Sequence, residues 1–381
     1  MGGFFGPYHS SKSATELQPG ALLHFCCAWG GTLSADAARS MYARPGAHAR
    51  AAGQEREQER VKWFGLTLLC ILCWSATDLF YKKGSELTDK LSHLKIMVWI
   101  GLIMAIAAVL LTPLSELQLS PMELIVYYRE YIPMAVLYVA ALMCGVIGTR
   151  YLDASVVSPL ENVDGAVAAV ILLAYFAVTG RLGEGTGITP WNIGSIVFVL
   201  AGVILLAVQE SRIAKGERNV PEMQKKHPLG ALAFVFPILY TLVDAGSMVF
   251  DSVVLAGGDE AYMGQFDLLI CESSCFAIAG GLSWLYMLTV KKAAYNPFRK
   301  SELVKCGAAL TEAAGNIFYA MATVASPLLT PVVTTGYCVL TILGARLFLK
   351  ERLTGKQYLC LALVLAGIAL SALSELTAGG A

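Results

Sequence analysis

The segment WSATD, residues 74–78, ends in an acidic residue within a long apolar stretch, and YTLVD, residues 240–244, repeats that arrangement 166 positions later. Two other pairs of segments follow in the same order at similar spacing, namely Ser-Pro at 158–159 and 326–327, and VLAG at 199–202 and 364–367. Three ordered pairs indicate one duplicated unit. A duplicated apolar unit that carries ionisable residues at depth is typical of secondary membrane transporters.

The composition predicts an all-α integral membrane protein. Of 381 residues, 56% are hydrophobic and 15% are charged, whereas soluble domains carry about 25% charge. Apolar stretches of about 20 residues recur along most of the chain, and this is the length that a helix needs to cross a bilayer. The strands of a membrane barrel would alternate between apolar and polar residues, and these stretches do not alternate.

Net charge and cysteine usage exclude several other classes. The formal net charge is zero, so a nucleic-acid partner has no electrostatic support. None of the five histidines lies in the middle of an apolar stretch, and the pair Cys70 and Cys73 lies in a continuous helical run, which favours buried thiols over a metal or redox site. We therefore expect no metal, no cofactor and no catalytic residue.

The apolar stretches predict ten transmembrane helices in two sets of five. We place them at about 61–82, 94–114, 131–149, 154–178, 189–209, 229–250, 263–289, 304–322, 327–349 and 356–375. The corresponding domains are a disordered N-terminal extension at 1–60, a first five-helix repeat at 61–209, a charged linker at 210–228, a second five-helix repeat at 229–375 and a tail at 376–381. Since each set is odd in number, the two repeats enter the membrane from opposite sides and are inverted.

Basic residues concentrate in the loops between spans 1 and 2, 5 and 6, 7 and 8, and 9 and 10. Such loops face the cytoplasm in most membrane proteins. The basic residues within 50–62, ahead of and at the start of the first span, favour the opposite orientation, so the sequence leaves the sidedness open. We expect a multi-pass protein of the cell membrane.

The end of the second repeat carries the most specific motif. It reads LGARLFLKERLTGKQYLCLALVLAGIALSAL at 343–373 and is preceded by Ser-Pro-Leu at 326–328. This segment resembles the closing two helices of an EamA-type transporter unit of the drug/metabolite transporter superfamily. Residues 351–354 match the Glu-Arg-Leu-Thr turn that joins those helices, and Ala366-Gly367 matches the pair of small residues near the end of the last one.

The first repeat resembles the family less closely. Ser158-Pro159 and Ala201-Gly202 match, but Thr179-Gly180 stands where the family has a Lys-Glu pair. Over residues 61–375 the resemblance implies ten helices, two inverted halves and a secondary carrier with a central site. The resemblance says little about the substrate.

Helical spacing groups the intramembrane acids with polar and aromatic residues. A charged side chain near the bilayer centre costs about 2.5–3.5 kcal/mol, so acids at that depth are candidates for function. Residues three, four or seven positions apart share one face of a helix. Three stripes of this kind are Trp74, Asp78 and Tyr81 in span 1, Tyr240, Asp244, Ser247 and Asp251 in span 6, and Glu312, Asn316, Tyr319 and Thr323 in span 8.

Spans 4 and 7 add further acids to these stripes. The residues that we predict to bind a substrate or a proton are Asp78, Asp244, Glu272, Glu312, Asn316, Glu161 and Asp164, and the predicted cavity wall is Trp74, Tyr240 and Tyr319. Asp251 and Asp267 are interpreted as structural, because they lie near the ends of their spans. For the other acids and the aromatic residues, packing within the bundle is the alternative. We expect spans 1, 6, 7 and 8 to contribute most of the polar cavity.

The expected function is secondary transport of a small polar metabolite, an amino-acid-like solute or a cationic solute by alternating access, with proton coupling as an option. Burial favours the protonated form of a carboxyl group, so cation binding and proton loss at one carboxyl would produce antiport. The expected partners are the lipid bilayer and a small-molecule solute, and a homodimer is compatible with the pattern. The alternatives are a membrane-embedded enzyme, for which no His-Glu-x-x-His or Cys/His motif is present, and a non-transporting scaffold or receptor, which would gain nothing from buried acids.

Overall fold

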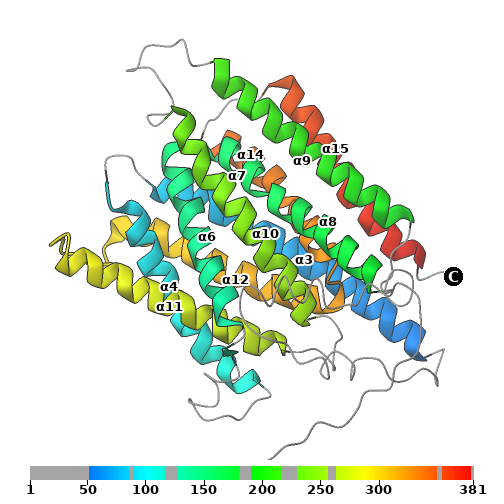
Figure 1. The fold of residues 1–381 in the computed structure, drawn as a ribbon, viewed down its shortest axis with the longest axis horizontal. Helices are drawn as coiled ribbons and strands as arrows, with labels where there is room; N and C mark the ends of the chain where they lie inside the picture. The colour runs from blue at the N-terminus through cyan, green and yellow to red at the C-terminus, as the bar shows by residue number, and fades with distance from the viewer. Residues whose placement is uncertain are drawn as a thin grey trace, which may run out of the picture.

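The computed structural model describes residues 51–85, 89–115, 128–129, 131–179, 190–216, 230–255, 263–349 and 354–378, and every regular element in these ranges is a helix. The first half contains α3 (Ala51–Gly84), α4 (Ser92–Leu111), η1 (Thr112–Leu114), α6 (Ile132–Tyr151), α7 (Ala154–Glu161), α8 (Val163–Val178) and α9 (Pro190–Gly216). The second half contains η4 (Gly230–Phe234), α10 (Val235–Leu255), α11 (Gln265–Thr289), η6 (Lys300–Glu302), α12 (Leu303–Ala325), α13 (Leu329–Thr334), α14 (Tyr337–Phe348) and α15 (Gly355–Ala378). Figure 1 shows them as one bundle.

Seven segments of the described chain are long and apolar enough to cross a membrane, as in a multi-pass membrane protein. They are Lys62–Gly84, Ser92–Leu114, Ile132–Tyr151, Val157–Val178, Leu232–Leu255, Gln265–Thr289 and Leu329–Phe348. The predicted all-α membrane class is thereby confirmed. Each of the ten predicted spans coincides with one helix or with two consecutive helices, but α9 and α15 contain only shorter apolar stretches, and α12 is not among the seven.

The outer surface of the bundle is apolar. Large side chains such as Leu72 on α3, Val109 on α4 and Leu282 on α11 point outward, with exposed fractions of 56%, 72% and 61%. A soluble monomer rarely exposes such an extended apolar surface, whereas lipid chains cover it without cost. The outward surface therefore agrees with the apolar character of the helices.

The helix ends differ in two places from the domain limits that the sequence pattern suggests. Helix α3 begins at Ala51 and so includes ten residues of the predicted N-terminal extension, while residues 1–50 of that extension lie outside the described chain. Helix α9 continues to Gly216 and so includes the start of the predicted linker, and α15 ends at Ala378, inside the predicted tail.

Two of the predicted spans are interrupted near their middle. Asn162 separates α7 from α8, and Thr335-Gly336 separates α13 from α14. Pro159 lies inside α7 and Pro331 lies inside α13. Because a proline lacks the backbone N–H that a helix interior uses, it weakens the turn before it. The interruptions at Asn162 and Thr335-Gly336 lie after the prolines, so the prolines alone do not account for them.

Helices α9 and α15 lie side by side at one edge of the bundle (Figure 1), and their contact is reciprocal. A Cβ atom on Gly202 would lie 2.6 Å from Cγ2 of Val364, and a Cβ atom on Gly367 would lie 2.6 Å from Cγ2 of Val199. The Ser195 hydroxyl donates a hydrogen bond to the carbonyl oxygen of Gly367 at 2.7 Å. A glycine on each helix thus makes room for a valine side chain of the other helix.

Helices α4 and α11 form a similar contact on the opposite side of the bundle (Figure 1). A Cβ atom on Gly101 would lie 2.7 Å from both the Cα of Gly280 and the carbonyl oxygen of Phe276. A Cβ atom on Gly280 would lie 2.7 Å from the Cα of Gly101 and 2.9 Å from the carbonyl oxygen of Met97. The two backbones therefore touch, which small residues permit at helix contacts in membranes.

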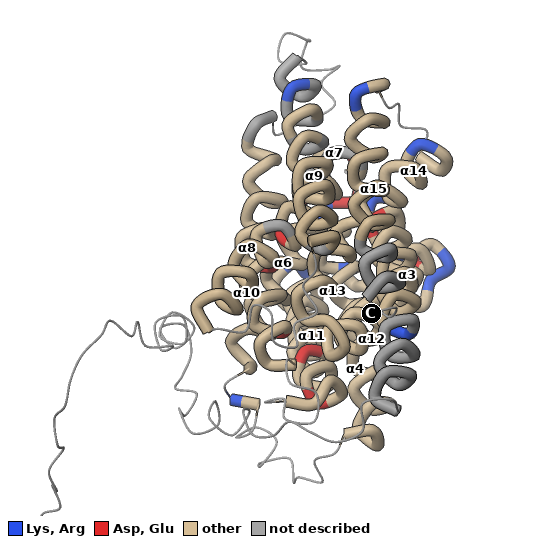
Figure 2. The backbone as a smooth tube through the Cα atoms, turned by 90° about the vertical axis from the view of Figure 1, so that its right-hand side faces the viewer, with Lys and Arg blue, Asp and Glu red and all other residues tan. Residues whose placement is uncertain are grey.

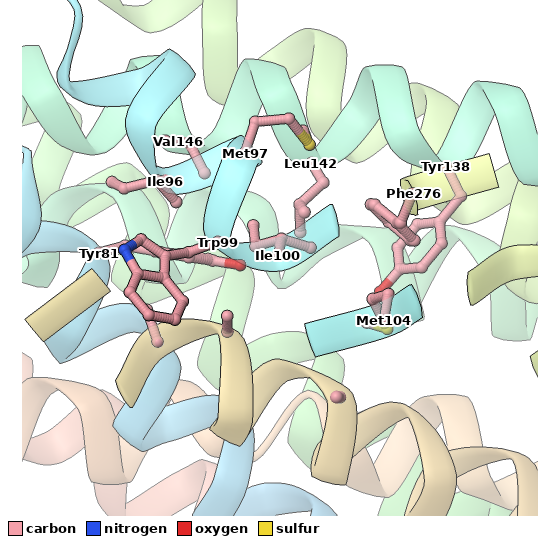
Figure 3. Close-up of a cluster of buried hydrophobic side chains, with 13 residues drawn as sticks. Tyr81, Ile96, Met97, Trp99, Ile100, Met104, Tyr138, Leu142, Val146 and Phe276 are labelled. Atoms are coloured by element: carbon pink, nitrogen blue, oxygen red, sulfur yellow. The ribbon is translucent and has the colours of Figure 1, made fainter. Parts of the chain in front are cut away.

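The remaining long helices pack in crossed pairs. Helix α3 packs on α12, and α10 packs on α6; in addition, α3 packs on α14 and α10 packs on α8. An apolar cluster fills the space between α3, α4, α6, α11 and α12 (Figure 3), with Tyr81 near one end and Tyr138 near the other. The ring of Tyr138 lies edge-on against Phe276, with 5.3 Å between ring centres. Both tyrosines belong to this cluster and also line a cavity inside the bundle.

Charged residues lie at several heights on the bundle. Figure 2 shows Lys and Arg at mid-height and near the lower end as well as at the end where α9 finishes and α15 begins, and it shows Asp and Glu from mid-height downward. Lys82 Nζ donates to the carbonyl oxygens of Leu152 at 2.6 Å and Thr149 at 3.2 Å, which ties α3 to the end of α6. Partial burial of Asp89 opposes its ionisation, but the hydrogen bonds from Lys95 and from the Leu91 backbone, together with the charges of Lys95 and Lys305, outweigh it and lower the pKa of Asp89.

Candidate binding site

A cavity of about 50 Å³ lies between α3, α6, α7, α8, α10, α11 and α12, with one residue from α14. One water molecule needs about 10–15 Å³ by the same measure, so this conformation leaves room for a few waters or one small solute. All ten residues that the sequence predicts for the site line this cavity: Asp78, Glu161, Asp164, Asp244, Glu272, Glu312 and Asn316, with Trp74, Tyr240 and Tyr319 as aromatic wall. The structure therefore brings together residues from both halves.

Helix α12 holds Glu312 between two tyrosines. The hydroxyl of Tyr81 on α3 donates to Oε2 of Glu312 at 3.1 Å, and the hydroxyl of Tyr138 on α6 donates to Oε1 at 3.1 Å. Each carboxylate oxygen thus has one donor, and hydrogen bonds to the ionised form stabilise it. Glu312 is only 3% exposed, so these two donors replace the water that the group would otherwise bind.

The next turn of α12 places Asn316 against Trp74. Trp74 Nε1 donates to Asn316 Oδ1 at 3.1 Å, and the Tyr138 hydroxyl lies 3.2 Å from the same oxygen. The indole ring also lies against Tyr319, with 5.2 Å between ring centres, and edge-on against Tyr337 at 5.8 Å. Trp74, Tyr319 and Tyr337 therefore form one connected group of rings from α3, α12 and α14.

A glycine on α12 makes room for this indole. A Cβ atom on Gly315 would lie 2.4 Å from Cδ1 and 2.5 Å from Nε1 of Trp74. We expect Gly315→Ala to push the indole away from Asn316 and to change the tryptophan fluorescence maximum of the purified protein. Gly246→Ala on α10 is the control, because nothing lies within 4 Å of its added Cβ. Equal spectra for the two variants would contradict the close fit of Trp74 on α12.

The acids of α7, α8 and α10 meet at the interruption between α7 and α8. Glu161 is the last residue of α7, and Asp164 lies in the first turn of α8. The carboxyl groups of Asp164 and Asp244 lie within hydrogen-bonding reach of each other. Ionised carboxylates only accept hydrogen bonds, so this contact needs a proton between the two groups or a cation beside them.

Asp78 on α3 also lines the cavity, and its partners are hydroxyl groups. The Thr341 hydroxyl on α14 donates to Oδ2 of Asp78 at 3.1 Å, and the Ser158 side chain on α7 is a second hydrogen-bond partner. Asp78 is 8% exposed. The two repeated acids, Asp78 and Asp244, therefore face one cavity but have different partners, a pair of hydroxyls in one case and a second carboxyl in the other.

A bridged pair of acids lies between α10 and α11. The hydroxyl of Tyr131, just ahead of α6, lies 2.7 Å from Oδ1 of Asp251 and 2.8 Å from Oε1 of Glu272. A phenol has one hydrogen to donate. When both hydrogen bonds form, one of the two carboxyls must therefore carry a proton and donate it to the Tyr131 oxygen.

The position of Asp251 differs from the one expected for a structural residue near a span end. Asp251 lines the cavity and is 6% exposed. Asp267, by contrast, lies in the first turn of α11, as expected, and accepts a hydrogen bond from Ser115 at 2.5 Å away from the cavity. Sequence reasoning also missed Tyr131 and Tyr138, which bind the acids from a span with no acidic residue of its own.

Span 4 contributes more to the site than expected. The sequence pattern favours spans 1, 6, 7 and 8, yet Glu161 and Asp164 from α7 and α8 also line the cavity. Their counterparts in the second half, at the repeat spacing of 168, are Leu329 and Val332 on α13. The interrupted helix of the first half is therefore acidic, and that of the second half is apolar at the same positions.

Comparison with known proteins yields a likeness of fold. No family model and no curated protein matches the chain. A solved structure described as "Crystal structure of protein" has a TM-score of 0.51 and 13% sequence identity, over 82% of this chain and 96% of that one. At this identity the similarity concerns the fold alone.

The balance of charge around the cavity is one-sided. Seven carboxyl groups line it, and its lining residues include no Lys, Arg or His. The ion pairs within the described chain join other acids, such as Lys95 with Asp89 and Lys305 with Glu302. Within the same ranges, no three His, Cys, Asp or Glu side chains are placed to hold one metal ion. Protons or a bound cation must therefore supply the missing positive charge, because buried unpaired carboxylates are very unfavourable.

Proposed function

We propose that this protein is a secondary transporter of the EamA type, which moves a small polar or cationic solute across the cell membrane by alternating access, in exchange for protons. The observation that carries this proposal is the cavity between the helices, with seven buried carboxyl groups and no basic lining residue. Intramembrane acids are costly to insert and mark ion or substrate pathways. A site between packed helices near mid-bundle is where secondary carriers bind their cargo.

The packing supports two inverted five-helix repeats. Exchange of the two halves maps the glycine contacts onto each other. In the pair α9 and α15, adding 165 to the residue numbers of the first-half glycine and valine gives the glycine and valine of the second half. In the pair α4 and α11, adding 179 to the numbers of the first-half contact residues, Gly101 and Met97, gives those of the second half. The same exchange maps the α3–α12 contact onto α10–α6, and α3–α14 onto α10–α8. Such pairing is expected when two copies of one unit are related by a two-fold axis.

The contact between Asp164 and Asp244 supports coupling to protons. A shared proton satisfies the two carboxyls when the site is empty, and a bound cation can replace that proton. Because both species neutralise the same groups, binding of one favours release of the other. This competition is sufficient for antiport, provided that the cavity opens to one side at a time.

Cysteine accessibility tests alternating access without knowledge of the cargo. In a variant that lacks the ten native cysteines, Ser247→Cys places a thiol in the cavity wall, where Ser247 is 2% exposed. We expect a membrane-impermeant methanethiosulfonate reagent to label this thiol in both right-side-out and inside-out vesicles, because the cavity opens to each side in turn.

The matched control is Leu242→Cys on the same helix, since Leu242 is 63% exposed on the outer surface and faces lipid. That variant should resist the reagent in both kinds of vesicle. Labelling of Ser247→Cys from one side only would refute alternating access and favour an enzyme or a receptor that is open to one face.

A further inference from the structure

Four polar atoms of residues that line the cavity have no hydrogen-bond partner within the described chain. They are Oε1 of Glu161, Oδ2 of Asp164, Nδ2 of Asn316 and the hydroxyl of Tyr319, which can donate or accept. The exposed fractions of these residues are 4%, 1%, 5% and 6%. Buried polar groups are nearly always paired, so unpaired ones at a cavity point to a ligand or to bound water.

The orientation of the Asn316 amide decides what it offers to a ligand. Trp74 Nε1 can only donate, and it contacts one amide atom of Asn316 at 3.1 Å, so that atom is the oxygen. The Tyr138 hydroxyl contacts the same oxygen at 3.2 Å. The amide nitrogen is therefore the group that remains for a ligand, and it requires an acceptor.

The two carboxylate oxygens require the opposite partner. Glu161 and Asp164 flank the interruption at Asn162. In the cation-bound state, in which Asp164 no longer shares a proton with Asp244, the free oxygens of both carboxylates only accept hydrogen bonds. An ammonium group with N–H bonds satisfies them, whereas a quaternary ammonium has no hydrogen to donate. A ligand carboxylate would add a negative charge to a cavity that already has seven carboxyls and no basic lining residue.

We infer that the cargo is a small primary or secondary ammonium compound that also carries a neutral oxygen acceptor, a hydroxyl or a carbonyl. The ammonium group lies between Glu161 and Asp164, and the oxygen accepts a hydrogen bond from Asn316. This assignment rests on the proposed function and narrows its solute class. The cavity volume of about 50 Å³ favours compounds of a few non-hydrogen atoms in this conformation.

A matched set of small probes tests each part of the inference. Thermal shift of the detergent-purified full chain is measured with ethanolamine, and with analogues that each lack one feature: choline has no N–H, propylamine has no oxygen, glycine has a carboxylate and ethylene glycol has no charge. A ligand that binds only the folded state raises its stability. We expect ethanolamine to bind at least about tenfold more tightly than each analogue, because sites that hydrogen-bond a group reject compounds without it.

A conservative variant links the preference to Asn316. Asn316→Asp keeps the oxygen that Trp74 contacts and replaces the amide donor with an acceptor. It should remove the preference for ethanolamine over propylamine. Asn296→Asp is the control: it makes the same change at an exposed loop position, where the Asn296 oxygen accepts a hydrogen bond from the backbone of Phe298, and it should leave the preference unchanged.

The outcomes separate this inference from the proposed function. Equal binding of propylamine, choline or glycine, or no thermal shift with ethanolamine, would overturn the ligand class. Ethanolamine binding that survives in Asn316→Asp with its preference intact would overturn the role of Asn316. If ethanolamine binds as expected but proteoliposomes show no protein-dependent flux of it, the ligand class stands and the proposed transport fails.

Discussion

Asp244→Asn should abolish ethanolamine transport in proteoliposomes while the protein remains folded. Asparagine has the same shape as aspartate, but it cannot share a proton with Asp164 or carry the charge that a cation needs. Loss of one partner of a buried contact between opposite charges, here the carboxylate and the bound ammonium group, costs about 2–5 kcal/mol of binding, which corresponds to a loss of affinity of roughly 30- to 5,000-fold. The measurement is initial uptake of the radiolabelled amine, normalised to the amount of monodisperse protein.

Asp267→Asn is the control for this substitution. Asp267 is also buried and hydrogen-bonded, but it lies outside the cavity, so uptake should remain near the wild-type rate. Full activity of Asp244→Asn, or equal loss in both variants, would remove Asp244 from the transport site.

The pH dependence of binding provides a second readout of the Asp244 prediction. Since protons and the ammonium group compete for the same carboxyls, ethanolamine binding to the wild type should weaken as pH falls. The titratable groups that line the cavity with Asp244 are the carboxyls of Asp78, Glu161, Asp164, Asp251, Glu272 and Glu312 and the phenols of Tyr81, Tyr138, Tyr240, Tyr319 and Tyr337. Binding that is independent of pH between about 5 and 8 would reject the competition, because a carboxylate site must lose charge when it takes up protons.

Gly280→Ala should lower the thermal midpoint of the protein by several degrees, whereas Gly281→Ala should leave it unchanged or raise it. The added Cβ at position 280 would lie 2.7 Å from the Cα of Gly101, and backbone atoms cannot rotate away as a side chain can. Overpacking of this kind costs about 1–3 kcal/mol. The measurement is the loss of monodisperse protein on heating in one detergent.

Gly281 is a close control because it is the next residue on α11 and its added Cβ meets nothing within 4 Å. There the better helix propensity of alanine contributes up to about 1 kcal/mol of stabilisation. Equal destabilisation by both substitutions would indicate a general effect on α11 and would contradict the close contact with α4.

Much of the site is predictable from the sequence, because helical spacing and burial act locally. Asp78 and Asp244 occupy equivalent positions in two apolar stretches, and each shares a helix face with an aromatic residue. That pattern is sufficient to predict inward-facing acids, since lipid would exclude them. The ten-helix inverted arrangement and the solute remain proposals, because composition and spacing constrain neither strongly.

Residues missed by the sequence analysis depend on contacts between distant segments. The sequence predicts a span that ends at about residue 250 and so places Asp251 at its end. In the structure α10 continues to Leu255, and Asp251 lines the cavity. Tyr131 binds Glu272 across 141 positions, and Tyr138 binds Glu312 across 174. Nothing in the residues around either tyrosine distinguishes it from an ordinary packing aromatic.

The reciprocal contact of α9 and α15 has a consequence for how this chain can change over generations. Val199 covers Gly367, and Val364 covers Gly202. A larger side chain at either glycine would therefore collide with the valine and the backbone of the other half. Under the proposed duplication, neither copy can drift alone at these four positions. Glu161 and Asp164 meet no such requirement from their counterparts, and there the copies are free to diverge into an acidic and an apolar version. Under the proposed duplication and transport function, the symmetry persists where the halves touch each other and fades at the positions proposed to bind the cargo.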